Sequence, residues 1–363
     1  LLALCIPERF GGLGEGFESY CLVAEQLALG NAATALTFNM HSTTMLMMGS
    51  ITDDIGIKPD LAQQHEAVRS VKFREVVENG VFYGQPHSEP VELGETDQAL
   101  SAGGRRFGTI AEKVEGGYRV TGRKFFVSLS GAASYFATPA LLLGDAPWID
   151  RTLYLQVPRD APGVNFEGEW NPTGMRATVS RNLVLDNVFI PDSGMVVPPG
   201  VFGQMFNRYM HGPVSFSATF LGLAQAAYDF TVNYLKGVVD GSPNLPVDIP
   251  IKANGLAEML FQLESARALF YRSISEAQID PPLEVVQRAR AAHVGVQRAV
   301  VRITQEAIRI CGGRAILKKF PVERFARDAC AAAVMRPWTQ DIAIRQAGEY
   351  ILNFGVARTH RAE

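Results

Sequence analysis

The chain has 363 residues, of which 47% are hydrophobic and 20% charged, so it can bury a large core and form two or three domains. Its 34 basic and 37 acidic residues give a net charge of −3. The sequence contains no basic run that would attract a phosphate backbone or an anionic lipid. Neither nucleic acid nor a membrane surface is therefore expected as a partner.

The cysteines and the apolar stretches exclude several other classes of protein. Cys5, Cys21, Cys311 and Cys330 lack CxxC and His-linked spacing, which argues against a zinc site and against a disulfide framework. We expect no bound metal and a cytoplasmic location. The apolar stretches are too short or too interrupted to span a bilayer. The sequence begins inside a loop pattern, so we expect that an N-terminal segment is missing.

The first part of the chain shows helical periodicity. Apolar residues recur at helical spacing from Phe17 to Gly30, and Gly30-Asn31 supplies a stop. Further helices are predicted over 32–49 and 59–77. We therefore predict an N-terminal helical domain over residues 1–79, incomplete at its start.

The pattern changes between residues 80 and 195, where we predict a middle β domain. Short alternating or β-branched runs are separated by Gly, Pro and Asp. Glu115-Gly-Gly117 lies between two such runs and predicts a hairpin turn, because glycine accepts positive φ without a steric penalty. The predicted strands are 118–121, 124–128, 152–157 and 182–185.

Helical periodicity returns after Pro198-Pro199-Gly200 and predicts a C-terminal domain over 196–363. A proline-rich segment at 240–250 separates the first two long helices. The pattern is that of a four-helix bundle in an α+β protein. The predicted long helices are 201–239, 251–277, 282–311 and 338–352, with a shorter one near 322–335.

Two adjacent motifs resemble those of acyl-CoA dehydrogenases. Residues 170–180 read WNPTGMRATVS and residues 183–191 read LVLDNVFIP, similar to the family's GMR turn and its "NV.IP" strand exit. Shorter resemblances extend over residues 6–348. These are IPERFGGLG at 6–14, SEP at 88–90, a diverged GSD element at 94–97, KFFVS at 124–128, CGG at 311–313 and VERFARD at 322–328.

The resemblance implies a fold with an N-terminal helical domain, a middle β-barrel or sandwich domain and a C-terminal four-helix bundle. It also implies bound FAD and assembly as a homodimer or homotetramer. A flavin that exchanges a hydride needs a polar donor near its reactive nitrogen and a dry pocket. The residues matching the family's flavin contacts are Ser88, Phe126 and Ser128, whose alternative roles are a turn serine, a core aromatic and a strand hydroxyl.

Further residues match positions near the dinucleotide and the substrate. Gly312-Gly313 at a helix end could present N–H donors to the pyrophosphate, and Arg309 could add a charge-assisted contact or remain a solvated helix residue. Thr339 falls where the family has a flavin-contacting polar residue, although helix capping is its alternative role. His41 falls where the family often carries a histidine, so it is assigned to the substrate pocket.

The carboxylate base of the family is missing. Removal of a proton beside a thioester needs an acceptor within hydrogen-bond reach. The two family positions for the glutamate hold Pro337 and Gly212 here, and neither can accept a proton. The nearest ionisable residues, Asp341 and His211, are the catalytic candidates, with capping and packing as their alternative roles.

Three functions are consistent with these residues. The first is FAD-dependent α,β-dehydrogenation of an acyl-CoA thioester in fatty acid metabolism. The second is a flavin-dependent monooxygenase or oxidase on the same fold, which the missing base and the Phe126-x-Ser128 pattern favour. The third is a catalytically silent subunit of a hetero-oligomeric dehydrogenase. In the first two the partner is a small-molecule substrate.

Overall fold

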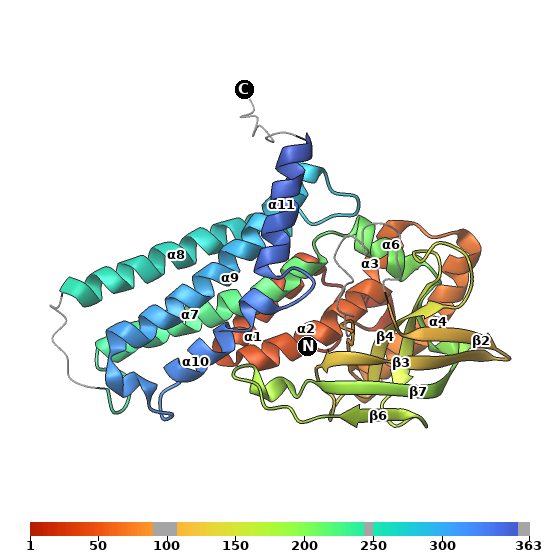
Figure 1. Cartoon of the computed structure of the whole chain (residues 1–363), viewed down its shortest axis with the longest axis horizontal. Coiled ribbons are helices and arrows are strands. Elements are labelled where there is room, and N and C mark those ends of the chain that lie inside the picture. The colour runs from red at the N-terminus through yellow and green to blue at the C-terminus, as the bar shows by residue number, and fades with distance from the viewer. Residues whose placement is uncertain (90–106, 243–249, 355–363) are drawn as a thin grey trace. The chain divides into compact units, whose positions relative to one another are not determined.

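The computed structural model describes residues 1–89, 107–242 and 250–354 (Figure 1). Internal contacts divide the chain into two units. The sheet unit comprises Leu1–Tyr20, Thr37–Asn171 and Arg176–Met210, and the bundle unit comprises Cys21–Leu36, Pro172–Met175 and the chain from His211 onward. The division into three domains at 79/80 and 195/196 stays a prediction.

The helices predicted near the N-terminus are confirmed. They are α1 (Phe17–Gly30), α2 (Ala32–Met48) and α4 (Pro59–Asn79), and the structure adds η1 (Glu8–Phe10) and α3 (Ser50–Ile55). The sequence explains both ends of α4. Pro59 occupies its first turn, where an N–H would have no intrahelical acceptor, and Gly80 adopts φ 64° after its last residue.

A mixed sheet forms the body of the sheet unit. Its order is β6-β7-β3-β2-β4-β5-β8, and β1 pairs with β4. β4 runs parallel to β1 and to β2, whereas the other pairs described are antiparallel. The strands are β1 (Tyr83–Gly84), β2 (Ile110–Val114), β3 (Gly117–Val127), β4 (Tyr135–Leu142), β5 (Thr152–Pro158), β6 (Val164–Glu167), β7 (Arg181–Pro191) and β8 (Met195–Val197).

The hairpin predicted at Glu115-Gly-Gly117 is confirmed and joins β2 to β3. Gly116 has φ 75°, which lies in the left-handed region that glycine adopts easily. A side chain on Gly117 would place its Cβ 2.2 Å from the Ile190 carbonyl oxygen on β7. Glycine is therefore required at the first position for conformation and at the second for space.

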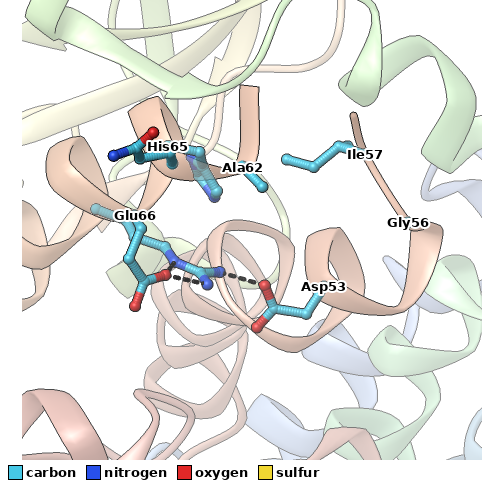
Figure 2. A pocket seen from close by; sticks show the side chains of 8 residues that line it. Asp53, Gly56, Ile57, Ala62, His65 and Glu66 are labelled. Atoms are coloured by element: carbon cyan, nitrogen blue, oxygen red, sulfur yellow. Dashed lines mark hydrogen bonds and ion pairs between the residues drawn. The ribbon is translucent and has the colours of Figure 1, made fainter. Parts of the chain in front are cut away.

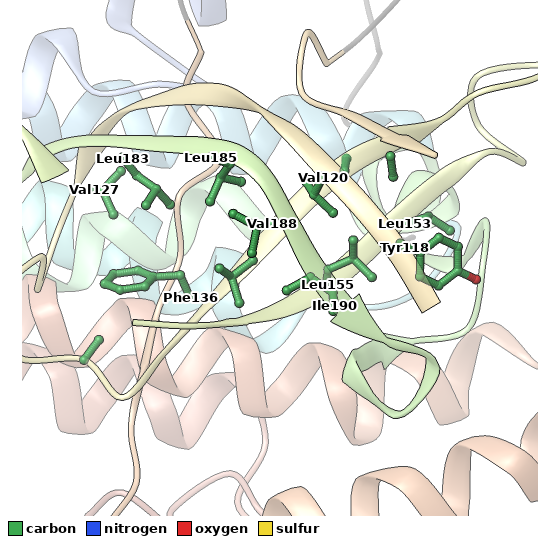
Figure 3. Packing of buried hydrophobic residues seen from close by; sticks show 14 residues of the cluster. Tyr118, Val120, Val127, Phe136, Leu153, Leu155, Leu183, Leu185, Val188 and Ile190 are labelled. Atoms are coloured by element: carbon green, nitrogen blue, oxygen red, sulfur yellow. The ribbon is translucent and has the colours of Figure 1, made fainter. Parts of the chain in front are cut away.

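The sheet encloses a continuous apolar core (Figure 3). Alternate residues of β3, β4, β5 and β7 point toward one another there, because successive side chains of a strand face opposite sides. Phe136 on β4 is fully buried, and its ring centroid lies 5.2 Å from that of Phe166 on β6. This core fixes the strands whose ends carry the candidate site.

The bundle unit is helical, as predicted. It contains α7 (Ser215–Leu235), α8 (Pro250–Ser275), α9 (Leu283–Cys311), α10 (Val322–Ala329) and α11 (Gln340–Phe354), with short 3-10 turns η4 (Gly212–Val214), η5 (Gly313–Ile316) and η6 (Ala332–Val334). Helix α9 packs against α7, α8, α10 and α11, and the long helices run side by side in Figure 1. The helical N- and C-terminal regions predicted from the sequence are confirmed, and the β region predicted between them as a barrel or sandwich forms a mixed sheet.

One helix boundary was predicted wrongly. A single helix was expected over 201–239, but the structure has α6 (Val201–Arg208), then η4, and then α7 from Ser215. Pro213 explains the break, because proline has no N–H and its ring clashes with the carbonyl four residues earlier. Gly212 before it adds conformational freedom.

Among the residues that the structure describes, none of the helices combines the length and the apolar character needed to cross a bilayer.

The core makes a prediction about stability. Phe136→Ala should lower the free energy of unfolding by about 3–5 kcal/mol, because it removes a fully buried ring and leaves a cavity. Phe189→Ala on β7, where the side chain is 41% exposed, is the matched control and should cost about 1 kcal/mol or less. Urea unfolding followed by circular dichroism measures both. Equal losses would contradict the assignment of this cluster as the core.

Candidate functional site

The end of β3 makes an unusual turn. Phe126 has φ 54°, where β3 and β7 slip out of register between Lys124 and Val127. Its side chain is 66% exposed and lies edge-on to Trp170, with ring centroids 6.3 Å apart. A bulky residue with positive φ is a conformational outlier, and such outliers cluster at functional sites.

A second strained segment holds this turn in place. The Leu129 N–H donates to the Thr178 carbonyl at 2.9 Å, and the Ser130 N–H donates to the Val179 carbonyl at 3.2 Å. Leu129 has φ 66° and Val179 has φ 44°, although Val179 is β-branched. The hydrogen bonds compensate for the strain by fixing residues 129–130 against residues 178–179. We call residues 125–130 and 178–180, which these hydrogen bonds join, the laced turns.

Three buried hydroxyl groups lie between the laced turns. Ser128 Oγ is 2.9 Å from Ser180 Oγ, which is 2.7 Å from Thr178 Oγ1. Ser128 was predicted as a flavin contact, whereas Thr178 and Ser180 were quoted in a motif without a role. Their place in the motif at 170–180 was the available signal, since Ser180 lies 52 residues from Ser128 in the sequence.

The Ser88 loop joins the same site. The Ser88 carbonyl accepts a hydrogen bond from the Phe125 N–H at 2.8 Å, so Ser88 lies beside the turn that carries Phe126 and Ser128. The structure therefore brings together the three residues predicted to contact the flavin ring. The remaining Pro90 of this motif and the diverged GSD element at 94–97 lie outside the described residues.

A buried ion pair between Lys124 and Glu89 anchors the Ser88 loop. Lys124 is fully buried, forms an ion pair with Glu89 and donates to the Pro139 carbonyl at 2.7 Å. Glu89 also accepts from the Thr109 N–H at 3.1 Å. Burial lowers the pKa of Lys124 to about 8, while Glu89 favours its charged form. The pair ties the residue after Ser88 to β3.

His41 is buried among backbone partners. Its Nε2 lies 2.8 Å from the Leu2 carbonyl, and its Nδ1 accepts from the Tyr83 N–H at 3.2 Å. These partners fit the neutral tautomer with the proton on Nε2, and burial lowers the pKa of His41 to about 4. The contacts support a structural role in joining α2 to β1. The assignment of His41 to a substrate pocket stays a prediction.

In the bundle unit, Arg309 and the glycine pair follow one another at the end of α9. Arg309 is half-exposed and pairs with Glu306, its Nε lying 2.8 Å from the carboxylate. The Gly312 N–H donates to the Ile308 carbonyl at 3.0 Å and closes the helix. A Cβ on Gly312 or Gly313 would meet nothing within 4 Å, so this backbone is open to an approaching group.

The glycine pair lies at a helix end that does not attract phosphate by itself. The pair follows the C-terminus of α9, where the helix dipole is negative and favours cations over phosphate. A phosphate here would depend on arginine charge and on local N–H groups, because the helix that begins at Gly313 is only a 3-10 turn of four residues. The predicted phosphate contact thus depends mainly on Arg309.

Two of the motifs quoted above meet in the bundle unit. The Met175 N–H donates to Asp328 Oδ1 at 2.6 Å, and Arg327 Nη1 donates to the Thr173 carbonyl at 3.0 Å. A Cβ on Gly174 would lie 2.0 Å from the Arg327 carbonyl oxygen. These contacts explain both the glycine of the GMR turn and the aspartate of α10.

The segment before α11 is held by a buried polar cluster. Nδ1 of His293 on α9 lies 2.8 Å from Ser217 Oγ, and Nε2 of the same ring lies 2.8 Å from the Trp338 carbonyl oxygen. Gln297 also donates to that carbonyl, at 3.1 Å. Sequence reasoning missed this cluster, because nothing in the sequence pairs His293 with Trp338, 45 residues away. The cluster fixes the backbone next to Pro337.

Thr339 and Asp341 lie at the start of α11. The Ile342 N–H approaches Thr339 Oγ1 at 3.3 Å, which matches the capping role considered for Thr339. Asp341 is exposed in the first turn of the helix. His211 is fully buried, and burial lowers its pKa to about 4, although Glu276 opposes this shift. Of the two catalytic candidates, only Asp341 is open to a substrate in the bundle unit as described.

A hollow of about 410 Å³ lies elsewhere in the sheet unit, between α3 and α4 (Figure 2). Arg69 reaches Asp53 at 2.7 Å and Glu66 through Nε at 2.7 Å. Arg9 pairs with the same two carboxylates, so two cations balance two anions and the hollow offers little net attraction to a charged ligand. The described part of the chain also contains no cluster of three His, Cys, Asp or Glu side chains that could hold a metal.

Two features of the laced turns and of Trp170 beside them fit a flavin ring. The indole Nε1 of Trp170 is buried beside Phe126 and has no hydrogen-bond partner among the described residues. An unpaired buried donor is costly and is usually explained by a missing water or ligand. In addition, the exposed Phe126 ring offers an apolar surface next to the hydroxyl of Ser128.

Comparisons with known proteins agree with these features. The family model "Acyl-CoA dehydrogenase, N-terminal domain" matches residues 1–52, and "Acyl-CoA dehydrogenase, C-terminal domain" matches residues 214–336. The putative acyl-CoA dehydrogenase YdbM of Bacillus subtilis (strain 168) is 30% identical over 356 residues, covering 96% of this chain and 86% of that protein.

Two solved structures share the fold. Butyryl-CoA dehydrogenase from Megasphaera elsdenii superimposes with a TM-score of 0.77 at 24% identity, covering 97% of this chain and 87% of that chain. FMN-bound TdsC from Paenibacillus sp. A11-2, a dibenzothiophene monooxygenase, superimposes with a TM-score of 0.78 at 21% identity, covering 97% and 88%. At these identities the likeness concerns the fold alone.

The buried histidines make stability depend on pH. Burial lowers the pKa of His41, His65, His211 and His293 to about 4 each. The unfolded chain binds protons at these sites from about pH 6.5 downward, whereas the folded chain does not, so the free energy of unfolding should fall between pH 6.5 and 4. The slope is up to about 1.4 kcal/mol per pH unit for each histidine.

His293→Gln should reduce this slope, since it removes one of the four groups. Urea unfolding at pH 7, 6 and 5 compares the variant with the wild type. The same slope in both proteins would show that His293 is already protonated in the folded state.

Proposed function

This chain belongs to the acyl-CoA dehydrogenase family, and we propose on that premise that it binds FAD and is an oxidoreductase acting on a small molecule. Members of the family use FAD, are typically oligomeric and act on acyl-CoA. The observation that carries the proposal is the pair of laced turns. They hold Phe126, Leu129 and Val179 at positive φ and place Ser88 beside Phe125.

The proposed cofactor contacts are of two kinds. Within the sheet unit, Ser88 and Ser128 are the proposed polar contacts of a flavin ring, and Phe126 is its proposed apolar face. Within the bundle unit, Arg309, Gly312 and Gly313 are the groups proposed to contact a phosphate, and Thr339 is a proposed hydroxyl contact. The bound FAD supplies a hydride acceptor. The protein's contribution is to hold these polar groups in a fixed arrangement before the cofactor binds.

The reaction that we propose is α,β-dehydrogenation of an acyl-CoA thioester. It requires a group that accepts the α proton, and neither Pro337 nor Gly212 can do so. Asp341 is the base that we propose, because it is exposed and lies one helical turn beyond Pro337. His211 is the weaker candidate, since it is fully buried and its pKa is about 4.

A flavin-dependent monooxygenase or oxidase is the second candidate function. The substitution of the family's glutamate at both positions favours it, because oxygen chemistry does not need a base beside a thioester. The fold also hosts the monooxygenase TdsC. This candidate keeps the same flavin contacts and differs in what meets the reduced cofactor.

We further infer a homodimer or homotetramer in the cytoplasm, with a role in fatty acid metabolism. Apolar side chains on α8 support an interface, since Ile251 is 58%, Phe261 63% and Leu269 45% exposed. The four cysteines form no disulfide in the structure, which suits a reducing compartment. A silent subunit of a hetero-oligomer is the alternative, and it would purify without the yellow colour of bound flavin.

Arg309 provides the test of cofactor identity. Arg309→Glu should weaken FAD binding by about 10-fold or more, because it replaces a charge-assisted phosphate contact with repulsion. FMN binding should change little, since FMN has no pyrophosphate. Arg345→Glu is the matched control, because Arg345 forms a similar exposed helix pair with Glu349. Fluorescence titration measures both affinities, and equal effects of the two variants would refute the role of Arg309.

Rapid mixing with butyryl-CoA tests the reaction. Asp341→Asn should slow flavin reduction by about 100-fold or more, because general-base catalysis typically contributes ~10²–10⁴-fold. His211→Ala should change the rate by less than about threefold. Glu349→Gln on the same helix is the carboxylate control.

Unchanged reduction in Asp341→Asn would eliminate this base. If no acyl-CoA reduces the flavin while reduced flavin turns over rapidly with oxygen, the assignment moves to the monooxygenase.

A further inference from the structure

The hydroxyl groups of Thr178, Ser180 and Ser128 form a continuous chain inside the laced turns. The distances are 2.7 Å from Thr178 Oγ1 to Ser180 Oγ and 2.9 Å from Ser180 Oγ to Ser128 Oγ. The residues are 1%, 5% and 7% exposed. Water therefore cannot readily replace the hydrogen bonds between these hydroxyls, and this hydroxyl chain is a fixed part of the sheet unit.

The hydroxyl protons allow two directions of donation along these three residues. Each hydroxyl has one proton to donate and can accept hydrogen bonds through its lone pairs. If Thr178 donates to Ser180 and Ser180 donates to Ser128, the proton of Ser128 remains available for a further acceptor. In the opposite direction, Ser128 uses its proton on Ser180 and can only accept. Whether Ser128 donates to its next partner or accepts from it thus depends on Ser180 and Thr178.

The backbone keeps the chain in register. The Leu129 N–H bond to Thr178 and the Ser130 N–H bond to Val179 join the residues flanking the hydroxyls. Ser130 Oγ lies 2.9 Å from the Val179 carbonyl and accepts from the Arg181 N–H at 2.9 Å, so it belongs to this backbone support and not to the chain. Strain at Leu129 and Val179 is maintained to keep the hydroxyls aligned.

We propose that Thr178 and Ser180 are positioning residues that direct the Ser128 hydroxyl outward as a hydrogen-bond donor to an acceptor atom on the flavin ring. Neither residue touches the cofactor in this arrangement. Successive hydroxyls polarise one another, so Ser128 is also a stronger donor than an isolated serine. The inference rests on the proposed function, because it needs Ser128 to contact the flavin.

Two substitutions at Thr178 separate a hydroxyl role from a packing role. Thr178→Val keeps the shape and removes the hydroxyl, whereas Thr178→Ser keeps the hydroxyl and removes a methyl group. The valine variant should weaken FAD binding by about 5-fold and shift the visible absorption bands of the bound flavin. The serine variant should bind FAD within about twofold of the wild type, with unshifted bands.

Thr138→Val on β4 is the matched control. Thr138 is fully buried in the same sheet and donates to the Phe136 carbonyl at 3.0 Å, outside the hydroxyl chain. It should leave FAD affinity and absorption unchanged. Wild-type affinity in Thr178→Val, or equal weakening by the valine and serine variants, would overturn the proposal.

Ser128→Ala distinguishes failure of this inference from failure of the proposed function. If Ser128→Ala weakens FAD binding and Thr178→Val does not, the chain has no positioning role while the flavin contact stands. If Ser128→Ala has no effect, the flavin contact itself is wrong. Should Thr178→Val fail to fold, Ser180→Ala and Ser180→Thr make the same comparison, and only loss confined to the alanine variant supports the chain.

Discussion

The positive φ of Phe126 at the end of β3 is the constraint on which the candidate site depends. A non-glycine residue in this conformation costs of order 1–3 kcal/mol, and it persists only where its surroundings over-determine it. Here the hydrogen bonds from Leu129 and Ser130 to the second laced turn supply that determination. The buried Lys124 reinforces it by joining Glu89 to Pro139. As a result, an aromatic face and two serines are presented together at one strand end.

The bundle unit contains a comparable constraint around Trp338. His293 and Gln297 both hold its carbonyl oxygen, and these three residues are nearly inaccessible. The segment that carries Pro337 is therefore ordered by contacts to α9. Pro337 has no ionisable group, so this ordering cannot position a base at that residue. Asp341, the base that we propose, lies in the first turn of α11, after this ordered segment.

The proposed flavin contacts and the proposed base differ in how far they match the family. The residues that resemble flavin contacts lie together in the sheet unit, and the contact between Met175 and Asp328 preserves another family element. The two positions predicted for the base hold Pro337 and Gly212, and neither residue can accept a proton. A protein that keeps a flavin site while changing its base is open to substrates that lose no α proton, which is why oxygen chemistry is the second candidate.

The sequence by itself determined the succession of a helical, a β and a second helical region, the β2–β3 hairpin and the family. Apolar periodicity and turn residues such as Gly116 act over a few neighbours, so they can be read without a structure. It also indicated Ser88, Phe126 and Ser128, because they lie within motifs.

Only the tertiary structure decided which distant groups meet. The contacts of Ser128 with Ser180 and of His293 with Trp338 join residues 52 and 45 positions apart, and local periodicity carries no information on such pairs. The break of the predicted helix at Gly212-Pro213 needed the structure too, since apolar residues continue across it. The open space around Gly312-Gly313 became visible only in the structure, because it depends on which distant side chains pack nearby.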